Sequence, residues 1–298
     1  EDGSPYGGKD FVMWNPPFID EAQMTRRSPN SETTLTFSEL LKGEVRAIAF
    51  SRSRKTAELV YAYSRDRLKE ESVPLSQRIR PYRAGYLAED RRMIEEGLFD
   101  GSLLGVSATN ALELGIDVGD LDATIINGYP GTIASTWQQA GRSGRNGERS
   151  LSILIASDNP LDQYLMRHPS AFFEKPQEHV LIAPTNPYVL KPHLVCAAYE
   201  APLEPGDEAI LGEGGSGLLS ELEQDGEVRE ARGRWFPSAG VLFPAEELNI
   251  RSATGDFYQV VDQQSGVLIE HVDAGMVFAQ LHPGAVYLHK GEPFLVTE

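Results

Sequence analysis

The chain has 298 residues, of which 41% are hydrophobic and 24% are charged, a composition typical of soluble globular proteins that excludes wholesale disorder. At about 100–200 residues per domain, this length predicts two or three domains. The single cysteine, Cys196, excludes a disulfide framework and a cysteine-rich zinc module within these residues. No stretch reaches the roughly 18 apolar residues of a membrane span, and the first residues do not resemble a signal peptide, so we expect a cytoplasmic protein with no membrane partner.

The formal net charge of −17 is unevenly distributed. Residues 198–298 hold 5 Lys and Arg against 18 Asp and Glu, whereas residues 46–92 hold 12 basic against 6 acidic side chains. The total charge argues against a nucleic-acid partner, because phosphate binding depends on Lys and Arg. The basic segment leaves two interpretations open: solvated helix faces, or a local anion-binding face. Its cationic residues include Arg52, Arg54, Lys55, Arg65, Arg67, Arg78, Arg80, Arg83, Arg91 and Arg92.

Strand and helix patterns alternate between residues 45 and 156. Short apolar runs predict buried strands, and the segments between them carry apolar residues at helical spacing, which predicts an α/β fold with a parallel sheet covered by helices on both faces. Before this region, Phe11–Trp14 is a candidate strand and Thr33–Leu41 a candidate helix. The predicted strands are Val45–Phe50, Leu103–Ser107, Ala123–Asn127 and Ser150–Ala156, and the predicted helices are one that starts after Ser51 or Ser53, Glu89–Phe99, a stretch near Asn110–Leu114, and Ala134–Ala140.

After residue 156 the pattern changes. Five prolines between residues 169 and 192 predict a domain boundary or a linking strap. Candidate helices at Pro187–Ala198 and Ser216–Gln224, followed by a ribbon within Glu227–Phe236, predict a small winged-helix-like unit. Short strands after residue 257 predict a β-rich piece. We therefore expect domains at residues 1–183, 184–244 and 245–298, the last being an incomplete beginning of a further domain.

The most informative motif is Q-x-x-G-R-x-G-R, from Gln138 to Arg145, between a predicted helix and a predicted strand. Arg142 and Arg145 are three residues apart, so they can point the same way from a helix end. Glycines such as Gly141 allow a phosphate to approach the backbone, and a guanidinium group grips phosphate oxygens with two parallel hydrogen bonds. The structural alternative is a cluster of salt bridges at the helix end.

Two further segments follow predicted strands directly. Ser107, Thr109 and the residues up to Asp117 place small and hydroxyl side chains at a strand's carboxyl end, a setting for anion or ribose binding. The Asp117 carboxylate, beside Gly115, can accept a hydrogen bond from a ribose hydroxyl or can instead cap a turn. Phe50–Thr56 places hydroxyls, a helix start and arginines where nucleic-acid phosphates bind well.

The order of these three segments resembles the motif sequence of the second RecA-like domain of superfamily 2 helicases. More closely, the chain resembles the MrfA/YprA-type DNA helicases, which are related to RecQ, and the resemblance extends over nearly all of it. The stretches that carry it are Tyr82–Arg92, Ala108–Asp117, Gly128–Gly131, Trp137–Arg145, Pro160–Leu165, Asn186–Leu190 and His282–Glu292.

The resemblance implies ATP-driven 3′ to 5′ translocation on single-stranded DNA with unwinding, in the service of DNA repair. ATP and Mg²⁺ would bind between this domain and a first RecA-like domain of the same protein. Arg145 would be the arginine finger, Arg142 a second contact to the γ-phosphate and Gln138 a residue near the nucleotide, while Gly115, Asp117 and Gly141 would also contribute to nucleotide binding. The candidates for contact with the DNA backbone, on a single strand or at a single–double-strand junction, are Ser51, Arg52, Ser107 and Thr109.

Two segments imitate motifs of the missing first domain. Gly3–Asp10 fits the P-loop pattern G-x-x-x-x-G-K, but Asp10 replaces the metal-binding hydroxyl and no strand precedes the segment. Asp20–Gln23 imitates an acidic box, but Pro16 and Pro17 disrupt the strand that should deliver it. We therefore expect this chain alone not to hydrolyse ATP.

No metal site is predicted. The family's four-cysteine zinc cluster cannot form from Cys196 alone. His282 and His289 are better explained as satisfied or exposed histidines than as a metal pair.

Three alternatives stay open at this stage. The chain can belong to an RNA helicase, because the motifs do not distinguish DNA from RNA. It can instead be a catalytically silent nucleic-acid-binding or protein-interaction module on the same fold. Within the predicted wing, Arg229, Arg232, Arg234 and Trp235 suit either contact with duplex DNA or a solvated ribbon with one core tryptophan.

Overall fold

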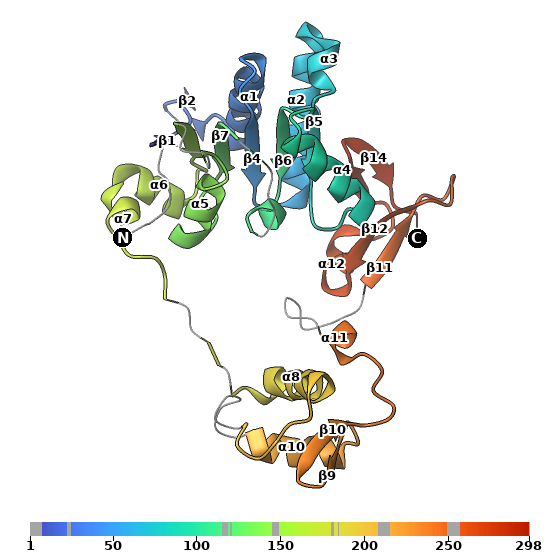
Figure 1. Cartoon of the computed structure of the whole chain (residues 1–298). Helices are drawn as coiled ribbons and strands as arrows, with labels where there is room; N and C mark the ends of the chain where they lie inside the picture. The colour runs from blue at the N-terminus through green and yellow to red at the C-terminus, as the bar shows by residue number, and fades with distance from the viewer. Residues whose placement is uncertain are drawn as a thin grey trace. The chain divides into compact units, whose positions relative to one another are not determined.

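The computed structural model describes residues 8–22, 25–114, 119, 121–144, 149–179, 182–183, 185–207, 215–248 and 257–297. The chain forms two compact units, and Figure 1 labels most of their elements. The first unit comprises residues 1–178, 258–272 and 276–298, and the second comprises residues 179–257 and 273–275. The C-terminal strands thus group with the first unit. The described helices include none with the length and apolar character needed to cross a bilayer.

The first unit is built on six parallel strands in the order β1-β8-β7-β4-β6-β5, which confirms the predicted parallel sheet. Strand β5 is not evident from the sequence, because Arg80 and Pro81 interrupt its apolar pattern. The strands are β1 (Lys9–Trp14), β4 (Ala47–Ser51), β5 (Ile79–Tyr82), β6 (Gly105–Ala108), β7 (Ala123–Asn127) and β8 (Ser150–Ile155). A short hairpin, β2 (Phe18–Asp20) with β3 (Thr25–Arg26), follows β1.

Helices cover both faces of this sheet, as predicted. Residues alternate between the faces along β4: Ala47 and Ala49 pack in one core cluster with α1 and α2, whereas Ile48 and Phe50 pack in another with α4. Helix α5 packs on the same face as α4, against β7 and β8. The helices are α1 (Pro29–Lys42), α2 (Arg54–Glu71), α3 (Val73–Ser76), α4 (Ala88–Phe99), α5 (Ile133–Ala140), α6 (Pro160–Arg167) and α7 (Ser170–Phe173).

One predicted helix is wrong. The stretch near Asn110–Leu114 forms only a single 3₁₀ turn, Asn110–Leu112. The hydroxyl of Thr109 accepts a hydrogen bond from the backbone N–H of Ala111, only two residues further on, which is the reach of a tight turn.

The second unit has the predicted order of helices followed by a ribbon. Its core joins Leu194 of α8 (Pro187–Glu200), Leu222 of α10 (Gly215–Gln224) and Val228 of β9 (Val228–Ala231). Trp235, on the paired strand β10 (Arg234–Pro237), packs against this core, as the second interpretation of the wing expects. A short helix, α11 (Pro244–Glu247), follows.

The C-terminal piece, most of which belongs to the first unit, consists of two hairpins and one helix. Strands β11 (Phe257–Val261) and β12 (Leu268–Asp273) pair with each other, and so do β13 (Val286–His289) and β14 (Glu292–Leu295). Helix α12 (Ala274–Gln280), between the hairpins, is not evident from the sequence.

A buried charge cluster fastens this piece to the parallel-sheet domain. Arg83, only 2% exposed, follows β5, and its guanidinium lies 3.2 Å from Glu58 Oε1 of α2 and 2.7 Å from Glu270 Oε2 of β12. The hydroxyls of Tyr86 and Tyr287 donate to Glu58 and Glu270 respectively. Because buried charges are tolerated only when paired and hydrogen-bonded, each half of this cluster requires the other.

The same contacts account for part of the basic segment. Arg54 lies 3.4 Å from Glu270, and Arg65 lies 3.6 Å from Glu292. Together with the buried Arg83, these side chains bind the chain's own carboxylates. The predicted anion-binding face is therefore smaller than its arginine count suggests.

Gly85 provides a test of the charge cluster. A Cβ atom at Gly85 would lie 1.8 Å from Glu270 Oε1 and 2.6 Å from its carboxyl carbon, so Gly85→Ala must displace the buried carboxylate. We expect the free energy of unfolding to fall by about 1–3 kcal/mol, measured by urea unfolding. Gly43→Ala is the matched control, because φ is −78° there and the new Cβ would meet no atom closer than 3.4 Å. Equal stability of the two variants would contradict the prediction.

The buried, ionised Glu270 carboxylate should make the protein less stable in acid. Burial alone would raise the pKa of Glu270, but the adjacent His289 imidazole and the charge of Arg83 outweigh it and hold that pKa below its ordinary value of 4.5. The ionised carboxylate therefore stabilises the fold above about pH 4.5, and this stabilisation is lost as the pH falls through the lower, folded-state pKa. Glu270→Gln should be less stable at about pH 6 and should lose less stability between about pH 5 and pH 3. Parallel curves for the two proteins would argue against this role.

Candidate nucleotide and nucleic-acid site

The carboxyl ends of β4, β6 and β7 meet at one edge of the sheet, because all the strands run in the same direction. A pocket of about 290 Å³ lies at this edge. The chain segments that form it come from the ends of β4 and β7, from the turn after β6, and from α5. Its lining residues are Phe50, Ser51, Arg52, Asn110, Ile126, Asn127, Gly128, Pro130, Ser135 and Gln139.

Two predicted DNA contacts, Ser51 and Arg52, line this pocket. The Ser51 hydroxyl is buried and has no hydrogen-bond partner within the described part of the chain. Arg52 is exposed. A hydroxyl donor without a protein partner beside an exposed guanidinium group is an arrangement that can bind a phosphate oxygen.

Gly128 also lines the pocket. Its φ of +79° is a conformation that side chains rarely adopt, and a Cβ there would lie 2.8 Å from Ser157 Oγ. The neighbouring Asn127 donates from Nδ2 to Asn30 Oδ1 at 2.8 Å, which ties the end of β7 to the start of α1.

Ser107 and Thr109, the other two predicted DNA contacts, do not line the pocket. The Ser107 side chain is fully buried, and its hydroxyl donates to the carbonyl of Ala57 at 2.8 Å. The Thr109 hydroxyl caps the turn after β6. The sequence shows a hydroxyl at a strand's end but not its direction, and the Ser107 hydroxyl here holds β6 against α2.

Helix α5 borders the pocket and is fixed at its N-terminus. Thr132 accepts from the N–H of Ser135 at 3.0 Å, and the Glu178 carboxylate accepts from the N–H groups of Ile133 at 2.6 Å and Ala134 at 3.2 Å. These backbone hydrogen bonds, chiefly that of Ile133, lower the pKa of Glu178. A carboxylate at this position also complements the positive end of the helix dipole.

Glu113 connects the turn after β6 to the side of α5. Its Oε2 accepts from Ser135 Oγ at 2.7 Å and from Gln139 Nε2 at 2.9 Å. Glu113 belongs to the segment that leads to Gly115 and Asp117, and α5 leads to the arginine motif. The two segments that the sequence assigned to the nucleotide are therefore linked directly.

The structure describes only some of the residues that the sequence predicts to bind the nucleotide. Gln138 is exposed on α5, whereas Gly141 ends the helix and donates its N–H to the Trp137 carbonyl at 2.8 Å. Arg142 is 7% exposed, and its backbone N–H donates to the Gln139 carbonyl at 3.1 Å. Gly115, Asp117 and Arg145 lie outside the described residues, so their roles stay predictions.

Sequence reasoning missed several pocket residues, among them Asn127, Ser135 and Gln139. Asn127 and Gly128 follow a predicted strand directly, and that position was the available signal. Gln139 is adjacent to Gln138, but successive residues on a helix point about 100° apart, so one faces the pocket and the other solvent.

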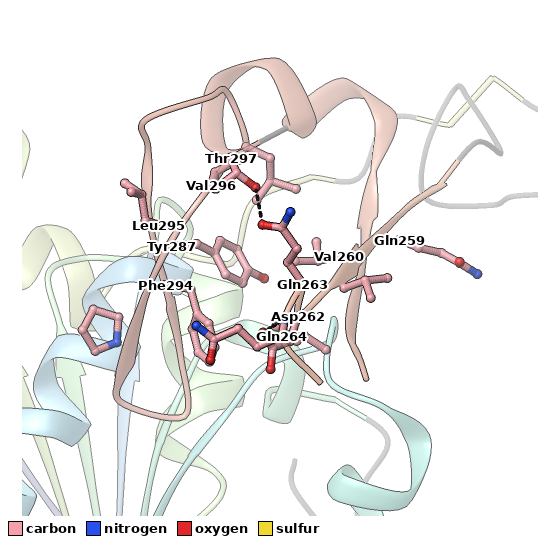
Figure 2. A pocket seen from close by; sticks show the side chains of 14 residues that line it. Gln259, Val260, Asp262, Gln263, Gln264, Tyr287, Phe294, Leu295, Val296 and Thr297 are labelled. Carbon is pink, nitrogen blue, oxygen red and sulfur yellow. Dashed lines mark hydrogen bonds between the residues drawn. The ribbon is translucent and has the colours of Figure 1, made fainter. Parts of the chain in front are cut away.

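A larger cavity, of about 820 Å³, lies in the C-terminal piece between β11 and β14 (Figure 2). The Asp262 carboxylate in its lining is held by its own turn, where it accepts from the N–H of Gln264 and the hydroxyl of Ser265. The Tyr287 ring, also in the lining, carries the hydroxyl bonded to Glu270. We place the functional site at the smaller pocket because it holds the unpartnered hydroxyl of Ser51 beside the exposed guanidinium group of Arg52. The described residues contain no group of three or more His, Cys, Asp or Glu side chains able to hold a metal ion.

Comparison with known families gives two matches. Residues 33–147 match the helicase conserved C-terminal domain, and residues 182–253 match the winged helix domain of ATP-dependent helicase HRQ1.

The chain is also similar to individual helicases. It is 40% identical over 301 residues to the ATP-dependent helicase YprA of Bacillus subtilis, covering 100% of this chain and 40% of that protein. It is 37% identical over 300 residues to the ATP-dependent helicase hrq1 of Schizosaccharomyces pombe, covering 98% of this chain and 28% of the relative.

A solved structure of the helicase MrfA bound to DNA and AMPPNP has a TM-score of 0.82 and 39% identity, covering 99% of this chain and 41% of that one. This chain therefore spans less than half the length of these relatives. The chain therefore matches one portion of the superfamily 2 helicases of the YprA and HRQ1 type, and this portion contains the helicase conserved C-terminal domain.

Proposed function

We propose that this chain is the second RecA-like domain, with its accessory units, of a DNA helicase that moves 3′ to 5′ along single-stranded DNA and unwinds duplex DNA. A first RecA-like domain of the same protein makes most of the contacts to ATP and Mg²⁺. Arg145, Arg142 and Gln138 complete the nucleotide site from this side, with Gly115, Asp117 and Gly141 near the nucleotide. On this proposal the chain alone does not hydrolyse ATP, and the complete helicase acts in DNA repair in the cytoplasm.

The observation that carries the DNA part of this proposal is the pocket at the carboxyl edge of the sheet. It combines the buried, unpartnered hydroxyl of Ser51 with the exposed guanidinium of Arg52. Both groups bind phosphate without reading a base, which suits an enzyme that must move along any sequence. The relative solved with DNA and AMPPNP supports the same assignment.

The arginine motif can be tested in the complete helicase, meaning the protein that carries this chain together with a first RecA-like domain. We expect Arg145→Ala to lower the rate of DNA-stimulated ATP hydrolysis by about 10³–10⁵-fold, because a guanidinium stabilises the charge of the transition state. Arg142→Ala should lower the same rate by a smaller factor. Binding of single-stranded DNA should persist in both variants.

Arg149→Ala is the matched control. Arg149 is four residues beyond Arg145, and its exposed side chain lies 2.8 Å from Asp10. Its loss should leave hydrolysis unchanged. If Arg142→Ala and Arg145→Ala also hydrolyse ATP at the full rate, the catalytically silent binding module becomes the better description.

The DNA pocket can be tested with Ser51→Ala. Removing an unpartnered buried hydroxyl should leave stability unchanged, whereas losing one phosphate hydrogen bond should weaken single-stranded DNA binding by about 3–10-fold. Ser64→Ala is the matched control, because the Ser64 hydroxyl is equally buried and unpartnered within the described residues but lies outside the pocket. Equal DNA affinities for the two variants, measured by fluorescence anisotropy, would count against the pocket.

A companion pair tests the charge at the pocket. Arg52→Ala should weaken DNA binding and reduce the slope of log affinity against log salt by about 1. Arg67→Ala, which removes an exposed arginine paired with Glu39 at 3.2 Å, should not change the slope. Competition by RNA of the same sequence distinguishes a DNA helicase from an RNA helicase.

A further inference from the structure

Lys9, the lysine of the segment that imitates a P-loop, has an internal role. In a genuine P-loop this lysine would lie between a glycine-rich turn and a helix, but here it begins the edge strand β1. Its register partner on β8 is Ser150, the first residue of the strand that follows the arginine motif. The ammonium group therefore lies beside the end of α5.

The ammonium group binds the chain on both sides of Arg142. Lys9 Nζ donates to the carbonyl oxygen of Ala140 at 2.7 Å and to that of Ser143 at 2.9 Å. The hydroxyls of Ser143 and Ser150 also lie 2.9 Å from it. Ala140 and Ser143 are buried and Lys9 is half-buried, so these contacts are partly shielded from water.

These contacts compensate for the end of a helix. The last carbonyl groups of a helix have no partner within it, and they lie at the negative end of its dipole. A cation that donates to the carbonyls of Ala140, at the helix end, and of Ser143, just beyond it, provides both a hydrogen-bond partner and a compensating positive charge. Burial lowers the pKa of Lys9 to about 8, which leaves the group mostly charged at pH 7.

The segment around Arg142 is also held from the sheet. The N–H of Gly144 donates to the carbonyl of Leu121 at 3.0 Å, and the Ser152 hydroxyl lies 3.5 Å from the Ala140 carbonyl. Lys9 differs from these anchors because it binds residues 140 and 143 at once. It therefore fixes the path of the chain immediately before Arg145.

We propose that Lys9 is a positioning residue for the arginine motif, holding the backbone of residues 140–143 so that the two guanidinium groups meet the phosphates of ATP in the correct orientation. This inference rests on the proposed role of Arg142 and Arg145. On this proposal Lys9 acts through the backbone of residues 140–143 and not by contact with ATP or DNA.

The test uses Lys9→Met in the complete helicase, since methionine keeps much of the apolar stem and removes the donors. A misplaced catalytic group costs up to about 100-fold in rate, so we expect kcat for ATP hydrolysis to fall by about 10–100-fold. KM for ATP and the Kd for single-stranded DNA should change by less than about threefold, because the lost interaction acts chiefly in the transition state. Lys42→Met is the control, since Lys42 pairs with Glu39 and Glu71 on the surface.

A double-mutant cycle separates positioning from a general structural effect. If Lys9 acts through the arginine motif, adding Lys9→Met to a variant that carries both Arg142→Ala and Arg145→Ala should cost much less than the same change in the wild type. Full additivity, or an unchanged kcat in the single variant, would overturn the inference. Should Lys9→Met fail to fold, Ser143→Ala is the alternative, because it removes one of the four oxygen atoms around the Lys9 ammonium. The inference then requires kcat to fall by about threefold while the melting temperature stays unchanged.

The outcomes also separate this inference from the proposed function. If Arg142→Ala and Arg145→Ala both leave hydrolysis intact, the proposed role of the arginines fails and the inference fails with it. If those changes abolish hydrolysis while Lys9→Met and Ser143→Ala do not slow it, only the inference about Lys9 fails.

Discussion

The parallel direction of the strands is the constraint on which the candidate site depends. Ser51, the turn after β6 and Asn127 come from different parts of the chain, yet they meet because β4, β6 and β7 all end at one edge. Backbone hydrogen bonding between the strands fixes their register, and the register fixes which side chains share the pocket. Helix α5 is then attached to this edge by Glu113, so the arginine motif is positioned relative to the same strands.

Helix α5 is held by charges of opposite sign at its two ends. The Glu178 carboxylate accepts hydrogen bonds from N–H groups at the start, and the Lys9 ammonium donates to the Ala140 carbonyl at the end, so each charge complements the helix dipole. Aromatic packing adds to this: the Trp137 ring stacks on Phe172, with centroids 5.4 Å apart. A short helix has little intrinsic stability, so tertiary contacts of this kind must define the direction in which its C-terminal arginines leave it.

The structure explains part of the uneven distribution of charge in this chain, whose formal net charge is −17. Part of the C-terminal acidity neutralises the parallel-sheet domain, because Glu270 and Glu292 face Arg54, Arg65 and Arg83. The basic segment is consequently divided: Arg83 is a buried counter-ion, while Arg52 is exposed at the pocket. Overall charge describes solubility and long-range attraction, whereas binding depends on the few cations that remain accessible.

The sequence by itself determined the α/β class, the parallel sheet and the helicase family, because apolar periodicity and the spacing of short motifs are local properties of the chain. It also placed Ser51 and Arg52 at a strand's end. Only the tertiary structure decided that the Ser107 hydroxyl turns inward, that Gln139 rather than Gln138 faces the pocket, and that β5 exists despite Pro81. It also decided the partners of Lys9, which are 131–141 residues away, and the arginine partners of Glu270, which are about 187 and 216 residues away. Such contacts depend on side-chain direction and on chain segments brought together by folding, and neither is encoded in local spacing.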